Sequence, residues 1–200
     1  MRDPLTQRPP ELDAFISAAA KAFDRHATDP AGRQAVAAIF AALKEPATGS
    51  EVAEGGRLPA CAHLPEALRT AAEVPALRPL LDRFRDLEPM LKWVRRAGDA
   101  TASANFPDGH ANAMIVGPGG LEPRGDVWLG VSLLAPHVRY PDHDHAPEEV
   151  YLVLSDGEFR QGDGEWFCPG VGGSFYNVPG IRHAMRAGAA PLFALWALRV

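Results

Sequence analysis

Short apolar segments separated by glycine- and proline-rich turns fill residues 105–200 of this 200-residue chain. In the clearest segment, every second residue would lie on one face of a strand, because alternate side chains point the same way: Val127, Leu129, Val131 and Leu133. Seven or more such segments are present, and no helix-forming stretch lies between them, which excludes parallel βαβ units. The segments 159–161 and 165–167 are expected to form a hairpin about Gly162-Asp163-Gly164. The pattern predicts an antiparallel, jelly-roll-like β-barrel.

The first half has a different character, because it is rich in alanine, leucine, arginine and glutamate, which favour helices. Helical spacing predicts a helix after Pro10 and a second one capped by Asp29 with Pro30 at its first position. A further helix is expected over 65–72, and one or two more over 75–96, interrupted near Pro89, with Val94 in their apolar stripe. A loop is expected from Gly49 to Gly56. The predicted fold is therefore a mainly β protein with an α-helical N-terminal half: residues 1–104 form a helical extension packed on a barrel of residues 105–200.

Charge and cysteine content limit the classes of partner. Twenty basic against 25 acidic side chains give a net charge of −5, which favours neither nucleic acid nor an anionic membrane as a partner. Only Cys61 and Cys168 are present, so a disulfide framework is not expected and a reducing compartment is the simpler inference. With no apolar leader and no membrane-length apolar segment, we expect a cytoplasmic protein, either a monomer or a homodimer.

The stretch from Tyr140 to Tyr151 concentrates the residues that carry chemistry. Odd positions in this stretch hold His143, His145, Glu149 and Tyr151. Strand geometry would place the two histidines on a common face, and likewise Glu149 and Tyr151. Imidazole and carboxylate groups together suit a divalent transition metal, and His183 could complete the set. The alternative is a group of surface histidines on a polar turn, which the clustering of ligand types disfavours.

These residues resemble the two motifs of the cupin family. His143-x-His145-x3-Glu149 matches the centre of the first motif, although His137 stands where a glycine is usual and Gly157 comes one residue late. The second motif appears as Gly173-x5-Pro179-Gly180-x2-His183, one residue shorter than usual, with Ala187 where asparagine is usual. The resemblance implies a cupin barrel with a metal site.

The combined pattern Tyr-x-x-His-x-His-x3-Glu-x-Tyr, together with the helical N-terminal half, is similar to the dimethylsulfoniopropionate (DMSP) lyases of the DddQ type, known from marine bacteria. That resemblance implies metal ligands at His145, Glu149, Tyr151 and His183. It places Tyr140 and His143 as further active-site residues. The implied cofactor is one divalent ion among Zn, Fe(II), Mn, Co and Ni.

The residues suit the lyase reaction, which removes a weakly acidic proton next to a carboxylate and releases dimethyl sulfide and acrylate. A metal would stabilise negative charge on the carboxylate, and a tyrosine beside the ion would have a lowered pKa. Tyr151 is the favoured base, Tyr140 competes with it, and His143 would orient one of them or move a proton. Five aromatic residues are available to hold the sulfonium cation, and the sequence leaves open which face inward: Trp128, Trp166, Phe175, Tyr176 and Trp196.

Two other functions remain open at this point. The same metal ligands would support another cupin enzyme, such as a dioxygenase or a sugar isomerase. A non-enzymatic cupin that binds a small ligand is the second alternative, although no basic recognition helix accompanies it. Cys168 is not expected to be a nucleophile, because no base lies near it in the sequence.

Overall fold

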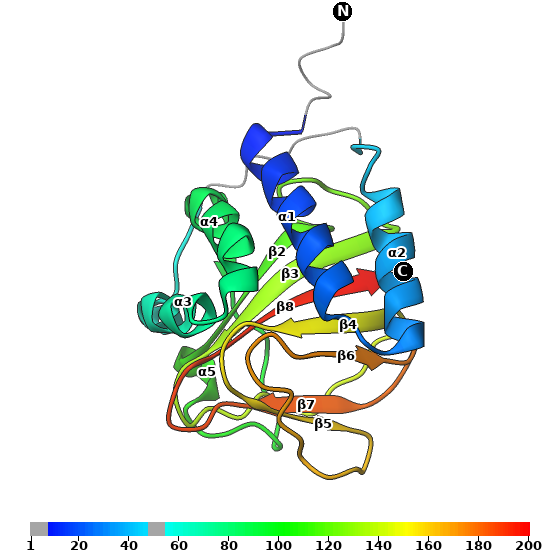
Figure 1. Ribbon diagram of the computed structural model, residues 1–200. Coiled ribbons are helices and arrows are strands. Elements are labelled where there is room, and N and C mark those ends of the chain that lie inside the picture. Colours follow the sequence, from blue (N-terminus) through cyan, green and yellow to red (C-terminus); the bar gives the residue numbers. More distant parts are fainter. Residues whose placement is uncertain (1–7, 48–54) are drawn as a thin grey trace, which may run out of the picture.

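The helix-forming segments of the N-terminal half cover one face of a sheet (Figure 1). The computed structural model describes residues 8–47 and 55–200, so most of the loop expected from Gly49 to Gly56 lies outside the described residues. The α-helices are α1 (Pro10–His26), α2 (Pro30–Ala42), α3 (Leu64–Ala72), α4 (Arg78–Leu87) and the short α5 (Phe106–Gly109). Within these described ranges, the 3-10 helices are η2 (Pro59–His63), η3 (Pro75–Leu77) and η4 (Glu88–Met90).

The start of α2 shows how the sequence specifies these helices. The Asp29 side chain accepts a hydrogen bond of 2.7 Å from the backbone N–H of Gly32, and Pro30 is the first helical residue. This N-cap satisfies a backbone donor that the helix itself leaves free, and the fixed φ of proline suits the first turn. The cap predicted from the sequence is confirmed.

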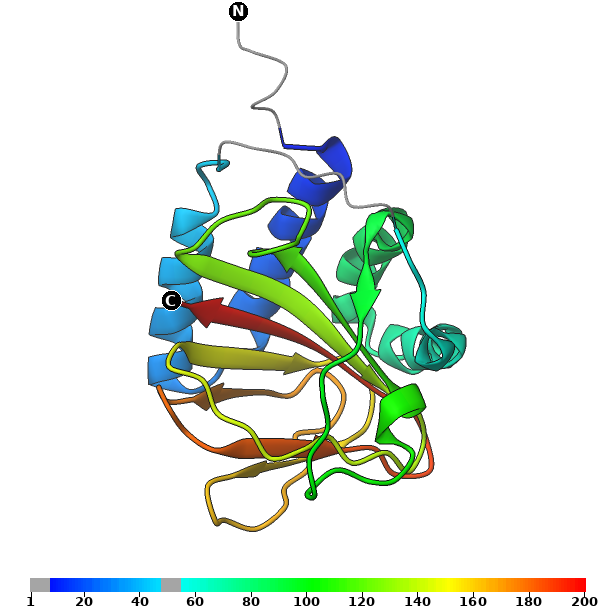
Figure 2. The same cartoon turned by 180° about the vertical axis from the view of Figure 1, so that it is seen from behind.

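The strands of the described residues form two antiparallel sheets. The larger sheet has six strands in the order β1-β2-β3-β8-β4-β6, and β5 and β7 pair separately. Figure 2, the view from behind, shows the β5–β7 pair at one end of the large sheet. The strands are β1 (Trp93–Val94), β2 (His110–Val116), β3 (Val127–Leu134), β4 (Glu148–Val153), β5 (Glu158–Gln161), β6 (Ser174–Asn177), β7 (His183–Arg186) and β8 (Leu192–Arg199).

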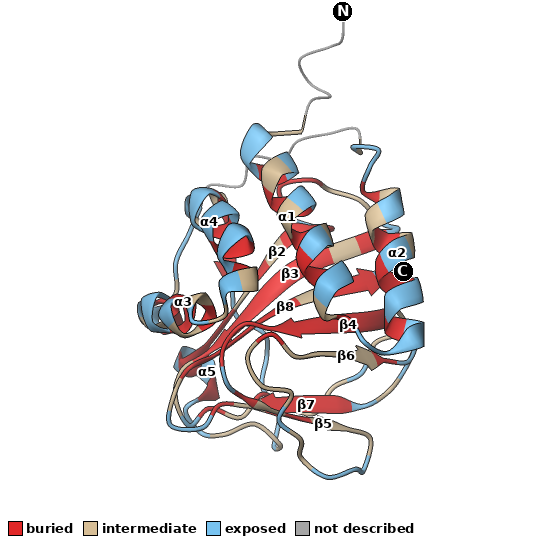
Figure 3. Ribbon diagram, in the orientation of Figure 1, coloured by how far each residue is buried: buried red, intermediate tan, exposed pale blue. Residues whose placement is uncertain are grey.

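The central strands β2, β3, β4 and β8 send alternate side chains to two different environments. Leu129, Val131 and Leu133 of β3 are fully buried in the core that the sheet shares with the helices, as their spacing predicted. In Figure 3 these central strands are mostly buried and β6 is mostly intermediate, whereas the helices are exposed on their outer side. A second, smaller core containing Tyr140 and Tyr151 lies on the other face of the sheet. One face of the sheet is thus left for the helices and the other for the functional residues.

Two predicted elements are only partly confirmed. The helical stretch expected over 75–96 is interrupted at Pro89 as predicted, but it ends with η4, and Trp93 and Val94 instead pair with β2, leaving Val94 43% exposed. Pro89 lacks a backbone N–H and interrupts helical hydrogen bonding, so the chain after it is free to join the sheet edge. The hairpin expected between 159–161 and 165–167 is present as one antiparallel bridge, Phe159 to Phe167, while β5 also pairs with β7.

The helices of the described residues are too short or too polar to cross a bilayer.

Candidate functional site

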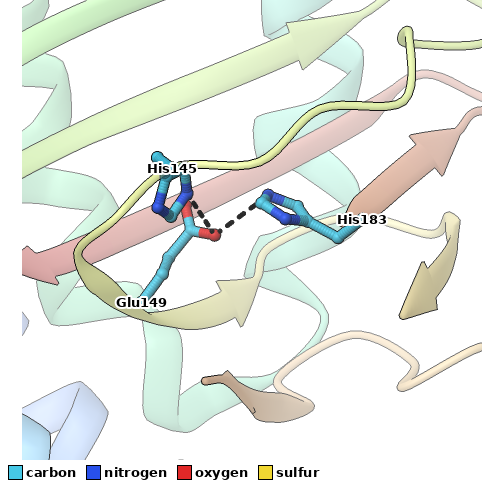
Figure 4. A group of neighbouring side chains, drawn as sticks. All are labelled: His145, Glu149 and His183. Carbon is cyan, nitrogen blue, oxygen red and sulfur yellow. Dashed lines mark ion pairs between the residues drawn. The ribbon is translucent and has the colours of Figure 1, made fainter. Parts of the chain in front are cut away.

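His145, Glu149 and His183 meet on the face of the sheet away from the helices (Figure 4). One Glu149 oxygen, Oε2, lies 3.4 Å from His145 Nε2 and 3.3 Å from His183 Nε2. The three ligand atoms all lie within 4.8 Å of one another. Glu149 comes from β4, His145 from the segment before it, and His183 from the start of β7. Both sheets therefore contribute to the group.

Backbone carbonyls fix how the two imidazoles present their nitrogens. His145 Nδ1 lies 2.9 Å from the carbonyl of Pro147, and His183 Nδ1 lies 2.9 Å from that of Ile181. A carbonyl can only accept, so Nδ1 carries a hydrogen in each ring and Nε2 is directed toward Glu149. His183 Nε2 is buried and has no hydrogen-bond partner. Two imidazoles and a carboxylate with this outer support fit a divalent metal ion.

Glu149 is itself held by amide side chains that the sequence did not single out. Asn177 Nδ2 donates to Glu149 Oε2 at 2.9 Å, and Gln161 Nε2 donates to Asn177 Oδ1 at 2.7 Å. Burial alone would raise the pKa of Glu149, but its contacts with His145 and His183 lower that pKa to about 2. Glu149 is thus a fixed anion before any ligand arrives.

His143 lies beside the group without joining it. Its backbone pairs with His183 through hydrogen bonds of 3.0 and 2.8 Å, and the two ring centroids are 4.1 Å apart. Burial and the neighbouring His183 lower the pKa of His143 to about 3. His143 is therefore a neutral imidazole in contact with both His183 and Tyr140, whose ring centroid is 5.1 Å away.

The two tyrosines occupy different surroundings. Tyr151 shares a strand face with Glu149 and stacks on Phe175, with ring centroids 5.0 Å apart and an interplanar angle of 15°. Burial, followed by the charge of Glu149, raises the Tyr151 pKa well above 10. Burial also raises the pKa of Tyr140, but Arg96 and a hydrogen bond from Asn112 oppose that rise.

A cavity of about 330 Å³ brings most of the predicted residues together. His143, His145, Glu149, Tyr140 and Tyr151 line it, and His183 reaches it through its contact with Glu149. The volume suits a small ligand of a few heavy atoms.

Of the five aromatic residues considered for a cation, Trp128 and Trp196 line this cavity, and Phe175 lies behind Tyr151. The other two lie elsewhere. Trp166 stacks on Arg186, with the guanidinium carbon 4.2 Å from its ring centroid. Tyr176 donates its hydroxyl hydrogen to Glu148 at 2.5 Å.

Four charged or polar lining residues were missed by the sequence reasoning: Arg95, Arg96, Asn112 and Ser132. Arg96 follows β1, and its backbone N–H donates to His110 Nε2 at 2.8 Å. Its guanidinium carbon lies 6.0 Å from the Tyr140 ring centroid, and Arg96 takes part in none of the ion pairs of the described residues. No local motif marks Arg96, and the helical stretch expected to continue to residue 96 did not predict its place beside the sheet edge. Cys168 is exposed and lies outside the cavity lining.

Comparisons with known proteins agree on one family. The DMSP lyase family model matches residues 31–194. The crystal structure of DMSP lyase DddQ from Ruegeria pomeroyi DSS-3 is similar over 94% of this chain and 92% of that chain, with 24% identity and a TM-score of 0.68. A chain from the crystal structures of DMSP lyases RdDddP and RnDddQII matches over 95% and 92%, with 21% identity and a TM-score of 0.67. No curated protein matches the sequence. The predicted fold class, an antiparallel cupin-type barrel with a helical N-terminal half, is confirmed.

Proposed function

This chain belongs to the DMSP lyase family, and on that premise we propose that it cleaves DMSP to dimethyl sulfide and acrylate in the cavity beside Glu149. The observation that supports this most directly is the position of the His145–Glu149–His183 group, whose carboxylate lines the same cavity as two tyrosines. A β-elimination needs both charge stabilisation and a base, and this wall offers candidates for each.

We propose that His145, Glu149 and His183 hold one divalent ion, Zn, Fe(II), Mn, Co or Ni, with the Tyr151 hydroxyl as a further ligand. When bound, such an ion supplies positive charge that stabilises an anionic carboxylate and lowers the pKa of the neighbouring tyrosine. The buried, unpartnered His183 Nε2 is the structural reason for expecting it.

In the proposed β-elimination, one proton moves from the substrate to the protein and two bonding electron pairs shift within the substrate. Tyr151, as the proposed base, accepts the proton from the carbon next to the carboxylate. The electron pair of that C–H bond forms the carbon–carbon double bond of acrylate, and the carbon–sulfur bond breaks. Sulfur leaves with the bonding pair as neutral dimethyl sulfide, so no oxidant or reductant is consumed.

The remaining lining residues suit the two ends of DMSP. The indole rings of Trp128 and Trp196 offer aromatic faces to the dimethylsulfonium cation. Arg96 adds a guanidinium that can attract the carboxylate. Tyr140 presents a second hydroxyl, and the neutral His143 ring holds it in place. A substrate with a cation at one end and an anion at the other therefore matches the lining.

The decisive experiment is headspace detection of dimethyl sulfide from purified, metal-loaded protein given DMSP, with and without a chelator. Elemental analysis before and after chelation reports whether the ion was removed. We expect release that chelation abolishes and re-addition of metal restores. Oxygen-free buffer should not slow it, which separates the lyase from a dioxygenase.

Neighbouring residues provide matched controls. Glu149→Gln should lose both metal and activity, whereas Glu148→Gln should keep both, because Glu148 pairs with Tyr176 and Arg199 instead. Tyr151→Phe should lower kcat by about 10²–10⁴-fold as the loss of a general base, while Tyr176→Phe leaves it unchanged. Folded, metal-loaded protein that releases no dimethyl sulfide would contradict the proposal.

A further inference from the structure

Three consecutive hydrogen bonds connect the Tyr140 hydroxyl to the indole of Trp196. Trp196 Nε1 donates to Ser132 Oγ at 3.0 Å, Ser132 Oγ donates to Asn112 Oδ1 at 2.7 Å, and Asn112 Nδ2 donates to Tyr140 Oη at 2.9 Å. All four residues line the cavity. We call the two middle residues, Asn112 and Ser132, the relay.

The chemistry of the groups fixes the direction of these bonds. An indole N–H can only donate, so Ser132 Oγ accepts from Trp196 and directs its single hydrogen to the Asn112 carbonyl. The Asn112 amide then donates to Tyr140. Among the hydrogen bonds of residues 8–47 and 55–200, none has Tyr140 Oη as its donor. The Tyr140 hydroxyl hydrogen is therefore left for a molecule in the cavity.

Strand register brings the relay together. Asn112 of β2 and Ser132 of β3 are direct cross-strand partners, and Gly130 of β3 is the partner of Trp196 of β8. A side chain at position 130 would collide with the Trp196 ring, so glycine leaves the surface of β3 open for the indole. The indole lies across β3 and its N–H reaches Ser132, which is only 4% exposed.

We propose that Asn112 and Ser132 are positioning residues that fix the Tyr140 hydroxyl relative to the indole face of Trp196. This proposal rests on the proposed function, since the ligand class is a small carboxylate carrying a sulfonium group. The cation lies against the indole, and the carbon that loses its proton lies near the tyrosines. The relay fixes the distance between the Trp196 indole and the Tyr140 hydroxyl. This distance then matches the one between the sulfonium and the carbon that loses its proton.

The position of each residue in the relay predicts a different kinetic defect. Ser132→Ala removes both hydrogen bonds of Ser132, so Trp196 is released and Asn112, which holds Tyr140, loses its anchor; we expect KM for DMSP to rise and kcat to fall. Asn112→Leu leaves Trp196 bonded to Ser132, so kcat should fall with KM unchanged. A roughly tenfold effect corresponds to 1.4 kcal/mol, the size of one lost buried hydrogen bond.

Two further variants test whether the residues act as one unit. The double variant Ser132→Ala/Asn112→Leu should be less impaired than the sum of the two single effects, because both changes break the same chain of hydrogen bonds. Ser132→Thr retains the hydroxyl and should recover most of the activity. Ser155→Ala is the matched control: Ser155 is equally buried, and its Oγ donates to the Pro191 carbonyl at 2.7 Å away from the cavity. It should leave kcat and KM unchanged even if it lowers Tm.

A spectroscopic readout tests the relay without turnover. In ¹⁵N-labelled protein, Tyr140→Phe should shift the indole N–H resonance of Trp196, assigned through Trp196→Phe, and leave that of Trp128 in place. If DMSP is not cleaved but this shift occurs, the relay stands and the proposed function fails. If DMSP is cleaved, Ser132→Ala stays within twofold of wild type and the resonance does not move, the relay is overturned.

Discussion

At the scale of single residues, His137 has an unusual backbone conformation with a physical cost. Its φ is 60°, in the left-handed region that favours glycine, and it stands where the cupin motif usually has glycine. Left-handed φ costs a residue with a Cβ about 1–2 kcal/mol, part of which glycine recovers despite its larger unfolded-state entropy. His137→Gly should therefore raise the free energy of unfolding by about 0.5–1 kcal/mol in urea titrations.

His137→Ala is the control, because alanine keeps the Cβ and hence the strain. It should give no gain in the same titrations. Equal stabilisation by alanine and glycine would mean that the histidine ring, and not the backbone conformation, is the unfavourable feature. His137 is exposed, so neither change should alter the core.

Arg96 and Arg95 are adjacent arginines with different partners. Both border the cavity, but Arg95 is held by the Pro107 carbonyl and Asp108, whereas Arg96 has no ion-pair partner among the described residues. If Arg96 attracts the substrate carboxylate, Arg96→Gln should raise KM for DMSP by about fivefold to tenfold, the range for one charge-assisted contact near solvent.

Initial-rate measurements over a range of DMSP concentrations test this, with Arg95→Gln as the matched control. The control should change KM by less than twofold. A similar rise in both variants would mean that general positive charge at the entrance, and not a specific contact of Arg96, governs binding.

The site residues predictable from the sequence are those with a local signature. His143, His145 and Glu149 are close along the chain, and their types point to metal chemistry by themselves. Asn112, Ser132 and Asn177 are common residue types on separate strands, and nothing local distinguishes them. Their proximity depends on strand register, which the sequence does not specify without knowing which strands pair.

At the scale of elements, one carboxylate connects two helices to the connection between β2 and β3. Glu122 lies in that connection and is 3% exposed. It accepts a hydrogen bond of 2.6 Å from Arg8, just before α1, and one of 3.2 Å from the backbone of Ala47, after α2. Arg124 also donates to it at 3.1 Å. Glu122 therefore joins segments that are far apart in the chain.

This carboxylate predicts how stability depends on pH. Burial would raise the pKa of Glu122, but its bonds to Arg8, Ala47 and Arg124 lower that pKa below 4.5 in the folded state. A group with a depressed folded pKa stabilises the protein fully above its unfolded pKa, and that stability is lost as the pH falls through the folded pKa. Glu122→Gln should cost about 3 kcal/mol at pH 7 and flatten the loss of stability below pH 4.5.

Urea titrations at pH 7 and at acidic pH provide the measurement, with the exposed Glu66→Gln as control. The control should follow wild type at every pH. If Glu122→Gln lost stability on acidification as steeply as wild type, other carboxylates would account for the acid sensitivity.

Elements were predicted well where the signal is local. The apolar stripe and the Asp29 cap located the helices, because both depend on residues within one or two turns. The pairing of β5 with β7 was not predictable, because it depends on contacts distant in sequence. Glu158 and Arg186 show such a contact, with Nε and Oε2 2.8 Å apart across β5 and β7.

At the scale of the whole molecule, we propose that the division between residues 1–104 and 105–200 is one of sequence character, and that the two regions fold together. Phe84 of α4 packs on Phe193 of β8 with ring centroids 5.2 Å apart, and the sheet residues facing the helices belong to the same core. Without the helices this apolar face would be exposed to water.

A fragment of residues 105–200 should therefore fail to unfold cooperatively in thermal denaturation followed by circular dichroism, whereas the full chain gives one transition. The fragment should also bind a dye that detects exposed apolar surface. A sharp transition from the fragment alone would show instead that the barrel is an independent folding unit.

The alternation along β2, β3 and β8 also separates the positions that contact the ligand from the positions that maintain the fold. Even-numbered positions such as 112, 132 and 196 face the cavity, while odd-numbered ones such as 113, 131 and 195 face the helices. Mutations that diversify substrate choice can therefore accumulate on one set of codons while the other set preserves the fold. A combinatorial library confined to the cavity-lining positions 112, 114, 128, 132, 196 and 198 should consequently yield a high fraction of folded variants, which makes this scaffold a good starting point for directed evolution.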